Sequence, residues 1–163
     1  MPATGQTENS LPQHPGVLAP PPLVFVTFIL AGWGLEFIFP RGHITLPWLG
    51  TVAGGVLVVC GFVLIAWSAF TFRRFGTSLN PWRGVRALVV SGPYRVSRNP
   101  VYAGDVLIHA GIGLLLNNGW ILVTLLPAIL VMQYGVILRE ERYLKKRFGD
   151  RYLAYCKHVR RWL

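Results

Sequence analysis

An uninterrupted apolar run over residues 49–72 constrains this chain more than any other feature. It holds 24 residues without a charged side chain and stops at Arg73 and Arg74. At 1.5 Å per residue, a helix of this length crosses the roughly 30 Å of hydrocarbon in a bilayer. Only 13% of the whole chain is charged and 53% is hydrophobic, whereas a soluble domain carries about a quarter charged residues. We therefore expect an integral membrane protein.

Three further apolar runs predict an all-α membrane fold with four transmembrane helices. They cover residues 23–39, 101–116 and 119–138. Only Asn117 and Asn118 separate the last two, so we expect these runs to form a tight antiparallel hairpin. The run 101–116 is short for a span, and we expect either the other helices or a second copy in a homodimer to cover it.

Small residues recur at a spacing of seven in the third run, as Ala103 and Ala110 and as Gly104 and Gly111. Small side chains on one helix face let a neighbouring helix approach closely. We expect this face to serve packing.

The basic residues gather on one side of the predicted bundle. The chain has 16 Lys and Arg against six Asp and Glu, for a net charge of +10. Six of the basic residues lie between the second and third runs, nine follow residue 138, and one lies in the first connection. The positive-inside rule makes the side with fifteen of them cytoplasmic, with both termini inside. Since topology accounts for the charge, we expect no nucleic-acid partner.

The segment between the second and third runs is longer than a connection needs. It contains a Gly-Pro turn at 92–93, and Asn99 and Pro100 have the residue types of a helix N-cap and first helical position. Free backbone N–H groups at that helix start, together with Arg95 and Arg98, would suit a carboxylate or another anion. The alternative is an ordinary interfacial turn with Tyr anchors and Arg topology markers.

Two glutamates, Glu140 and Glu141, directly follow the fourth run. If the helix continues to Phe148, both lie on its first cytoplasmic turn, level with the loop that precedes the third run. A carboxylate there could bind a ligand ammonium. The alternative is pairing within the helix, for example of Glu141 with Lys145, which contributes only a few tenths of a kcal/mol.

Asp105 and His109 are four residues apart and so share one face of the third helix. Ionisable groups inside a span are usually functional or paired. We consider Asp105, His109 and Glu141 for substrate-side roles, against a structural Asp–His or interhelical hydrogen bond. The histidines and cysteines have no metal-ligand spacing, so we expect no metal.

Several motifs follow one another in a fixed order. They are Gly92-Pro93-Tyr94, Arg98-Asn99-Pro100-Val101-Tyr102, the two-helix hairpin, Glu140-Glu141-Arg142-Tyr143-Leu144, Phe148-Gly149 and Tyr152-Leu153-Ala154-Tyr155. In this order and spacing, over roughly residues 72–162, the chain resembles the isoprenylcysteine carboxyl methyltransferase family and its phospholipid methyltransferase relatives.

The resemblance implies an integral membrane methyltransferase that uses S-adenosylmethionine without a Rossmann fold. Residues 1–22 would be a flexible lead-in, 23–72 two transmembrane helices, and 73–163 the cofactor-binding loop, the hairpin and a C-terminal cytoplasmic helical segment, with 23–163 as a single catalytic domain. The acceptor would be a membrane lipid or another lipophilic or small hydrophobic carboxylate, amine or thiol. A non-catalytic lipid-binding or scaffolding protein with a basic cytoplasmic face is the alternative.

Site residues carry over by position. Cofactor binding would fall to Arg86, Ala87, Leu88, Val89, Tyr94, Asn99, Pro100, Val101, Tyr102 and Glu140, with Glu140 holding the methionine ammonium, and catalysis to Arg98, Asn99 and Glu140. Two positions depart from the pattern. Asn99 stands where eukaryotic members commonly have histidine, and an amide cannot titrate, which argues against a general base there. Val136 stands where the isoprenylcysteine enzymes have a substrate-binding arginine, which argues against a prenylcysteine carboxylate.

Overall fold

The computed structural model describes residues 16–17, 19–40, 47–77 and 87–162, and every regular element in these ranges is helical. The elements are α1 (Pro21–Ile38), α2 (Pro47–Arg74), the 3-10 turn η2 (Gly92–Arg95), α3 (Pro100–Leu115), α4 (Gly119–Met132), the π-helical turn η3 (Gln133–Ile137), α5 (Leu138–Phe148) and α6 (Asp150–His158). The expected all-α fold is confirmed. The segments 1–15, 41–46 and 78–86 lie outside the described residues.

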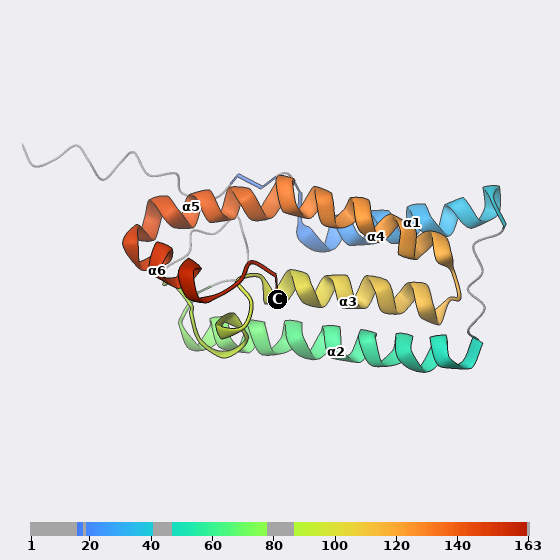
Figure 1. The fold of residues 1–163 in the computed structure, drawn as a ribbon, viewed down its shortest axis with the longest axis horizontal. Coiled ribbons are helices and arrows are strands. Elements are labelled where there is room, and N and C mark those ends of the chain that lie inside the picture. The colour runs from blue at the N-terminus through green and yellow to red at the C-terminus, as the bar shows by residue number, and fades with distance from the viewer. Residues whose placement is uncertain (1–15, 18, 41–46, 78–86, 163) are drawn as a thin grey trace, which may run out of the picture.

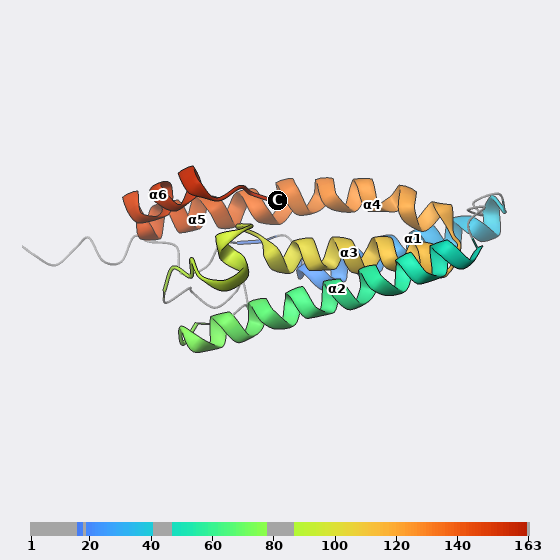
Figure 2. The same cartoon turned by 60° about the horizontal axis from the view of Figure 1, so that its bottom comes forward.

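The successive long helical segments α1, α2, α3 and α4–α5 alternate in direction along the bundle (Figure 1). The packing pairs α2 with α3 and α1 with α4, and α3 also contacts α4 and α1. Figure 2 shows α3 between α2 on one side and α4 on the other. The neighbouring helices thus cover the short third helix, one of the two arrangements that its length predicts. The ends of α2 and α5 and the start of α3 lie at one end of the bundle, with α6.

Among the described residues, three helices are long and apolar enough to cross a membrane, namely Pro21–Ile38, Trp48–Arg74 and Gly119–Phe148, and α3 is a shorter apolar helix. Large apolar side chains such as Trp33 and Phe37 of α1 and Val59 and Val63 of α2 are exposed on the outside of the bundle. Exposed apolar surface along long helices suits lipid as the solvent. The chain is an integral membrane protein.

Glycines bring the backbones of α2 and α3 into contact. A Cβ atom at Gly61 would lie 2.6 Å from the carbonyl oxygen of Gly104, and one at Gly54 would lie 2.7 Å from that of Gly111. The two glycines on each helix are seven residues apart, about two helical turns, so both contacts lie along one seam between α2 and α3. The packing role expected for the small-residue face of the third run is confirmed for its two glycines.

Two asparagines make the sharp connection between α3 and α4. Asn117 has a φ of +50°, a left-handed conformation that asparagine adopts more readily than most residues. Asn118 is the N-cap of α4, and its side-chain oxygen accepts a hydrogen bond of 3.1 Å from the backbone N–H of Ile121. The asparagines therefore end one helix and start the next within three residues.

The π-helical turn η3 interrupts an otherwise continuous helix from Gly119 to Phe148. This helix does reach Phe148, as considered for the glutamate pair. A π turn accommodates an extra residue, so the three successive residues Gly135, Val136 and Ile137 are all buried. The turn sets the direction in which α5, and hence Glu140, faces the rest of the bundle.

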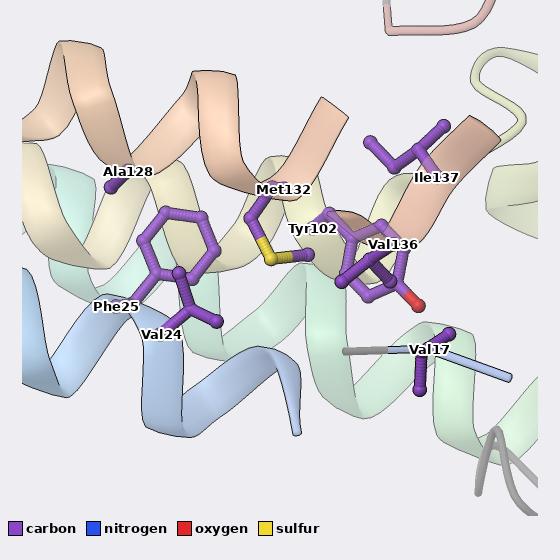
Figure 3. Packing of buried hydrophobic residues seen from close by; sticks show 8 residues of the cluster. All are labelled: Val17, Val24, Phe25, Tyr102, Ala128, Met132, Val136 and Ile137. Atoms are coloured by element: carbon purple, nitrogen blue, oxygen red, sulfur yellow. The ribbon is translucent and has the colours of Figure 1, made fainter. Parts of the chain in front are cut away.

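An apolar core joins α1, α3, α4 and η3 (Figure 3). It comprises Val17, Val24, Phe25, Tyr102, Ala128, Met132, Val136 and Ile137. The Tyr102 ring lies beside Val136 in this core, with its hydroxyl at the edge of the cluster. The core thus holds the start of α3 against the π turn.

The glycine seam gives a direct test of the packing. We expect Gly61→Ala to lower the free energy of unfolding by about 1–3 kcal/mol, the cost of overpacking, because the new methyl group meets backbone. Gly55→Ala, on the same helix with no atom within 4 Å of its Cβ position, is the matched control and should be neutral or slightly stabilising. Thermal unfolding in detergent measures both; equal effects would contradict the seam.

Candidate functional site

The candidate site lies at the end of the bundle where α3 begins and α5 follows the π turn. Five parts of the chain meet there: η2, the start of α3, α5, α6 and the four residues 159–162 that follow α6 (Figure 1). An isolated parallel bridge between Ser97 and Arg160 ties the last of these to the segment before α3. Most of the site residues predicted from the sequence lie at this end of the bundle.

Glu140 lies in a buried cluster of hydroxyl groups. Its Oε1 accepts a hydrogen bond of 2.8 Å from the hydroxyl of Tyr102 on α3. The Tyr94 side chain, from η2, is hydrogen-bonded to Ser68 of α2 and close enough to interact electrostatically with Glu140. No basic side chain among the described residues forms an ion pair with Glu140. A carboxylate at this depth is costly unless a cation compensates it.

Glu141, one residue along, has two basic partners. Its Oε1 lies 2.9 Å from Nη1 of Arg98, and Arg161 donates to both carboxylate oxygens at 2.9 and 2.8 Å. The planar guanidinium matches a carboxylate in this two-bond arrangement. These hydrogen bonds raise the pKa of Arg161 above its ordinary value, so it stays charged. Glu141 thus pairs across elements and not with Lys145 in its own helix.

Arg98 and Asn99 are engaged with the protein. Besides Glu141, the Nη1 of Arg98 lies 2.9 Å from Sγ of Cys156. Asn99 does occupy the N-cap position of α3 with Pro100 as the first helical residue, but its side chain makes no cap hydrogen bond. Its Nδ2 donates instead to the backbone oxygen of Arg161 at 2.9 Å. Arg98 therefore already contacts one carboxylate of the protein, and its role in binding an anion at this helix start stays a prediction.

Two buried tyrosines connect the site to α6. The hydroxyl of Tyr155 donates to the backbone oxygen of Tyr94 at 2.6 Å. Burial raises the pKa of both phenols well above their ordinary value, so both stay protonated and act as donors. The Tyr94 ring also packs on Phe72, with centroids 5.0 Å apart. Backbone and ring contacts together hold η2 beneath α6.

A surface hollow of about 710 Å³ opens next to Tyr155. Apolar and aromatic residues line it together with basic ones: Ala87, Leu88, Val90, Arg95, Phe148, Arg151, Ala154, Tyr155, His158 and Val159. The size and the mixed lining fit a small ligand with an apolar ring system and an anionic group. Two of the residues expected near a cofactor, Ala87 and Leu88, line this hollow.

The other residues predicted to bind the cofactor lie in the core of the bundle or outside the described residues. Val89 and Pro100 are buried, and Val101 packs against the apolar core. Arg86 lies outside the described residues. Val136, which is 1% exposed, belongs to the core beside Tyr102 (Figure 3). The departure from arginine at this position leaves an apolar surface next to the Glu140 cluster.

Asp105 and His109 lie deeper in the bundle. His109 is fully buried, and its Nε2 forms a hydrogen bond of 2.9 Å with the backbone oxygen of Ile121 in α4, while its Nδ1 has no partner. The Oδ2 of Asp105 is also buried without a partner. Of the structural alternatives for this pair, the interhelical hydrogen bond is confirmed. The unpaired Asp105 oxygen leaves a substrate-side role open to it.

Sequence reasoning missed the segment after α6. Arg161 was counted only as a topology marker, yet it binds Glu141 and its backbone oxygen accepts from Asn99. Trp162 donates from Nε1 to Oε1 of Gln133, the first residue of the π turn, at 3.1 Å. The only available signal was the Arg-Arg-Trp sequence itself, which does not say where the segment folds back.

A family model described as phospholipid methyltransferase matches residues 49–151, more than half of the chain. The chain belongs to the phospholipid methyltransferase family. The match begins in α2, runs through η2, α3 and α4, and ends at the start of α6. It therefore includes Tyr94, Asn99, Tyr102 and both glutamates.

Three individual relatives are similar to the chain, and one of them is named as a methyltransferase. The chain is 30% identical over 139 residues to the cobalt-zinc-cadmium resistance protein CzcN of Cupriavidus metallidurans, covering 85% of this chain and 58% of that protein. It is 28% identical over 128 residues to protein-S-isoprenylcysteine O-methyltransferase B of Arabidopsis thaliana, covering 76% of this chain and 64% of that enzyme. An uncharacterized Haemophilus influenzae protein is 40% identical over 63 residues, 39% of this chain and all of that protein. The chain thus spans less than two thirds of the first and second of these relatives.

The two adjacent glutamates should respond differently to loss of charge. We expect Glu141→Gln to lower the free energy of unfolding by about 1–3 kcal/mol, because it leaves Arg98, 14% exposed, without its carboxylate. The effect stays below that of a fully buried pair because Arg161 is 37% exposed.

Glu140→Gln is the matched control. Its amide oxygen can still accept from Tyr102, so we expect a change below about 1 kcal/mol in the absence of ligand. Chemical denaturation in detergent compares the two variants. An equal or larger loss for Glu140→Gln would contradict the assignment of the structural role to Glu141.

Proposed function

We propose that the protein is an S-adenosylmethionine-dependent methyltransferase that acts on a lipophilic or small hydrophobic acceptor at the cytoplasmic membrane surface. The observation that supports this proposal best is Glu140, a half-buried carboxylate with no basic partner among the described residues, next to Glu141, which has two. In a chain with a net charge of +10, an unpaired carboxylate beside a paired one suits a ligand cation. Family membership supports a methyl donor that carries such a cation.

The residues present suit this cofactor by chemical type. S-adenosylmethionine has an ammonium, a carboxylate and a purine, and it supplies an already activated methyl group on a sulfonium. Glu140 would hold the ammonium. The hollow lined by Ala87, Leu88 and Tyr155 offers apolar and aromatic surface for the purine, and Arg95 in the same lining offers a cation for the carboxylate.

The side chains would act by positioning more than by bond chemistry. Attack on an activated methyl group needs a nucleophile in line with the leaving group, and holding two reactants in that geometry can supply much of the rate. Tyr102 fixes the Glu140 carboxylate by a 2.8 Å hydrogen bond, and Asn99 fixes the start of α3 through the backbone of Arg161. Neither group needs to titrate for this role.

Several classes of acceptor are candidates, and all of them combine a large apolar part with a nucleophilic group. Phospholipid amines, prenylated thiol-linked carboxylates and small hydrophobic thiols or amines are candidates, entering laterally between the helices. The buried Val136 argues against a prenylcysteine carboxylate, and Asp105, with a buried unpaired oxygen, favours a cationic amine. Measuring transfer of a labelled methyl group into extracted lipids and into soluble acceptors would distinguish these classes.

Loss of the Glu140 charge tests the cofactor proposal. We expect Glu140→Gln to weaken binding of S-adenosylhomocysteine about 10- to 100-fold, because a charge-assisted hydrogen bond becomes a neutral one. Calorimetry on detergent-solubilised protein measures the affinity. Arg73→Gln, in the last turn of α2 on the side of the membrane proposed to be cytoplasmic, is the control and should bind normally. Folded wild-type protein without affinity for either S-adenosylmethionine or S-adenosylhomocysteine would refute the proposal.

Substitutions at two groups of positions would distinguish the enzyme from a lipid-binding or scaffolding protein. A non-catalytic protein that used its basic face should tolerate changes at Tyr94, Asn99 and Glu140 as well as changes at Arg73 or Lys145. A steep loss of function confined to the first group favours the enzyme. Equal tolerance in both groups favours the non-catalytic alternative.

We also propose that all four helices cross the membrane with both termini in the cytoplasm. The support is the sequence position of fifteen of the sixteen basic residues, within 73–98 and 139–161, and the alternating direction of the successive helices α1 to α4 (Figure 2). In a background with Cys60→Ser and Cys156→Ser, Lys145→Cys should react with an impermeant maleimide only from the cytoplasmic side. Trp48→Cys and Asn117→Cys should react only from the opposite side. Labelling of Asn117→Cys from the cytoplasm would show that α3 does not cross.

A further inference from the structure

The four residues 159–162, here called the strap, pass from the end of α6 across the start of α3 and reach the π turn (Figure 1). The backbone oxygen of Arg160 accepts a hydrogen bond of 3.0 Å from the N–H of Arg98. The next oxygen, of Arg161, accepts from Asn99 Nδ2 at 2.9 Å and from the Ser97 hydroxyl at 3.4 Å. The strap therefore covers the three residues that precede α3.

The strap is also fixed to the long helix on both sides of Glu140. Trp162 bonds to Gln133 at the beginning of the π turn, and Arg161 holds Glu141 by two hydrogen bonds on the first turn of α5. Glu140 lies between these two anchor points. Because Glu140 and Glu141 share one turn of backbone, a contact that fixes the rotation of α5 through Glu141 also fixes the direction of the Cα–Cβ bond of Glu140. The strap thereby links the two helices that carry Glu140 and Tyr102.

The two arginines of the strap differ sharply in what their side chains do. The Arg161 guanidinium is 37% exposed and makes the two-bond pair with Glu141. The Arg160 side chain is exposed and pairs with none of the described residues, since only its backbone oxygen is used. An identical substitution at these neighbouring positions therefore separates the specific pair from the general loss of a positive charge.

We propose that Arg161 is a positioning residue, which through Glu141 and through its backbone contact to Asn99 holds Glu140 and the start of α3 in the geometry that binds the methyl donor. This inference rests on the proposed function. It assigns to the strap a part in ligand binding and not only in stability. The ligand itself need not touch Arg161.

The test is a double-substitution cycle read by affinity for S-adenosylhomocysteine, measured by calorimetry well below the unfolding temperature of each variant. We expect Arg161→Gln to weaken affinity about tenfold, within the range of coupling seen for contacting residues. Glu141→Gln also removes the pair with Arg98 and should weaken affinity at least as much. The double variant should be no worse than Glu141→Gln, because that single substitution already removes the pair with Arg161. Arg161→Lys should restore part of the affinity, and Arg160→Gln should bind like wild type.

The outcomes separate this inference from the proposed function. Wild-type protein that fails to bind overturns both. Normal affinity in Arg161→Gln, additive effects of the two substitutions, or an equal loss in Arg160→Gln overturns the inference alone. If Arg161→Gln does not fold, Trp162→Phe is the second variant: it keeps an aromatic ring at this position and removes the hydrogen bond to Gln133. We then expect weaker affinity with little change in unfolding temperature, and unchanged affinity overturns the inference.

Discussion

Direct backbone contact between α2 and α3 is the constraint on which this structure depends. Glycines at 54 and 61 face glycines at 111 and 104, and a single methyl group at any of these positions would come within 3 Å of the opposing helix. In lipid, helices gain little from burying apolar surface against each other, so close van der Waals packing must hold them together. The seam holds the short helix α3 inside the bundle, and α3 carries Asn99, Tyr102 and Asp105 at fixed heights.

Glu140 and Glu141 are adjacent but have different partners, because α3 is held close to α5. Both lie on the first turn of α5, but the preceding π turn directs Glu140 toward Tyr102 and leaves Glu141 facing Arg98 and Arg161. One carboxylate is neutralised by the protein, which stabilises the joint between α3, α5 and the strap. The other accepts a hydrogen bond from Tyr102 and has no basic partner among the described residues. A rigid, paired group beside an unpaired one is an arrangement suited to binding a cation without local rearrangement.

The polar groups of this chain are therefore graded along the bundle. Deep in the apolar part, His109 is satisfied by a backbone carbonyl of α4, and Asp105 has one buried oxygen unpaired. Toward the basic end come the hydroxyl groups of Tyr102 and Tyr94, then the two glutamates and their arginines. Such a gradient agrees with membership in a family of membrane methyltransferases.

The sequence determined the helical class, the helix boundaries and the family. Uncharged runs long enough to span a bilayer can only be helices here, because backbone groups in lipid must bond within their own segment. Arg73 and Arg74 end α2, and Asn117 and Asn118 turn the chain, since these signals act locally. The motif order identified the family and the glutamate pair. It did not say which glutamate would be paired, and the intrahelical partner Lys145 was the wrong alternative for Glu141.

Only the tertiary structure decided the partners. The bonds from Arg161 to Glu141 and from Asn99 to the strap join residues 20 and 62 positions apart, and no local pattern encodes such contacts. The π turn depends on packing against α3 and on the bond from Trp162, so its sequence carries no separate signal. Propensity and hydrophobic period act over a few residues, whereas the choice of ion-pair partner depends on which surfaces the closed bundle brings together. The sequence therefore named candidate residues, and the fold decided which of them contact one another.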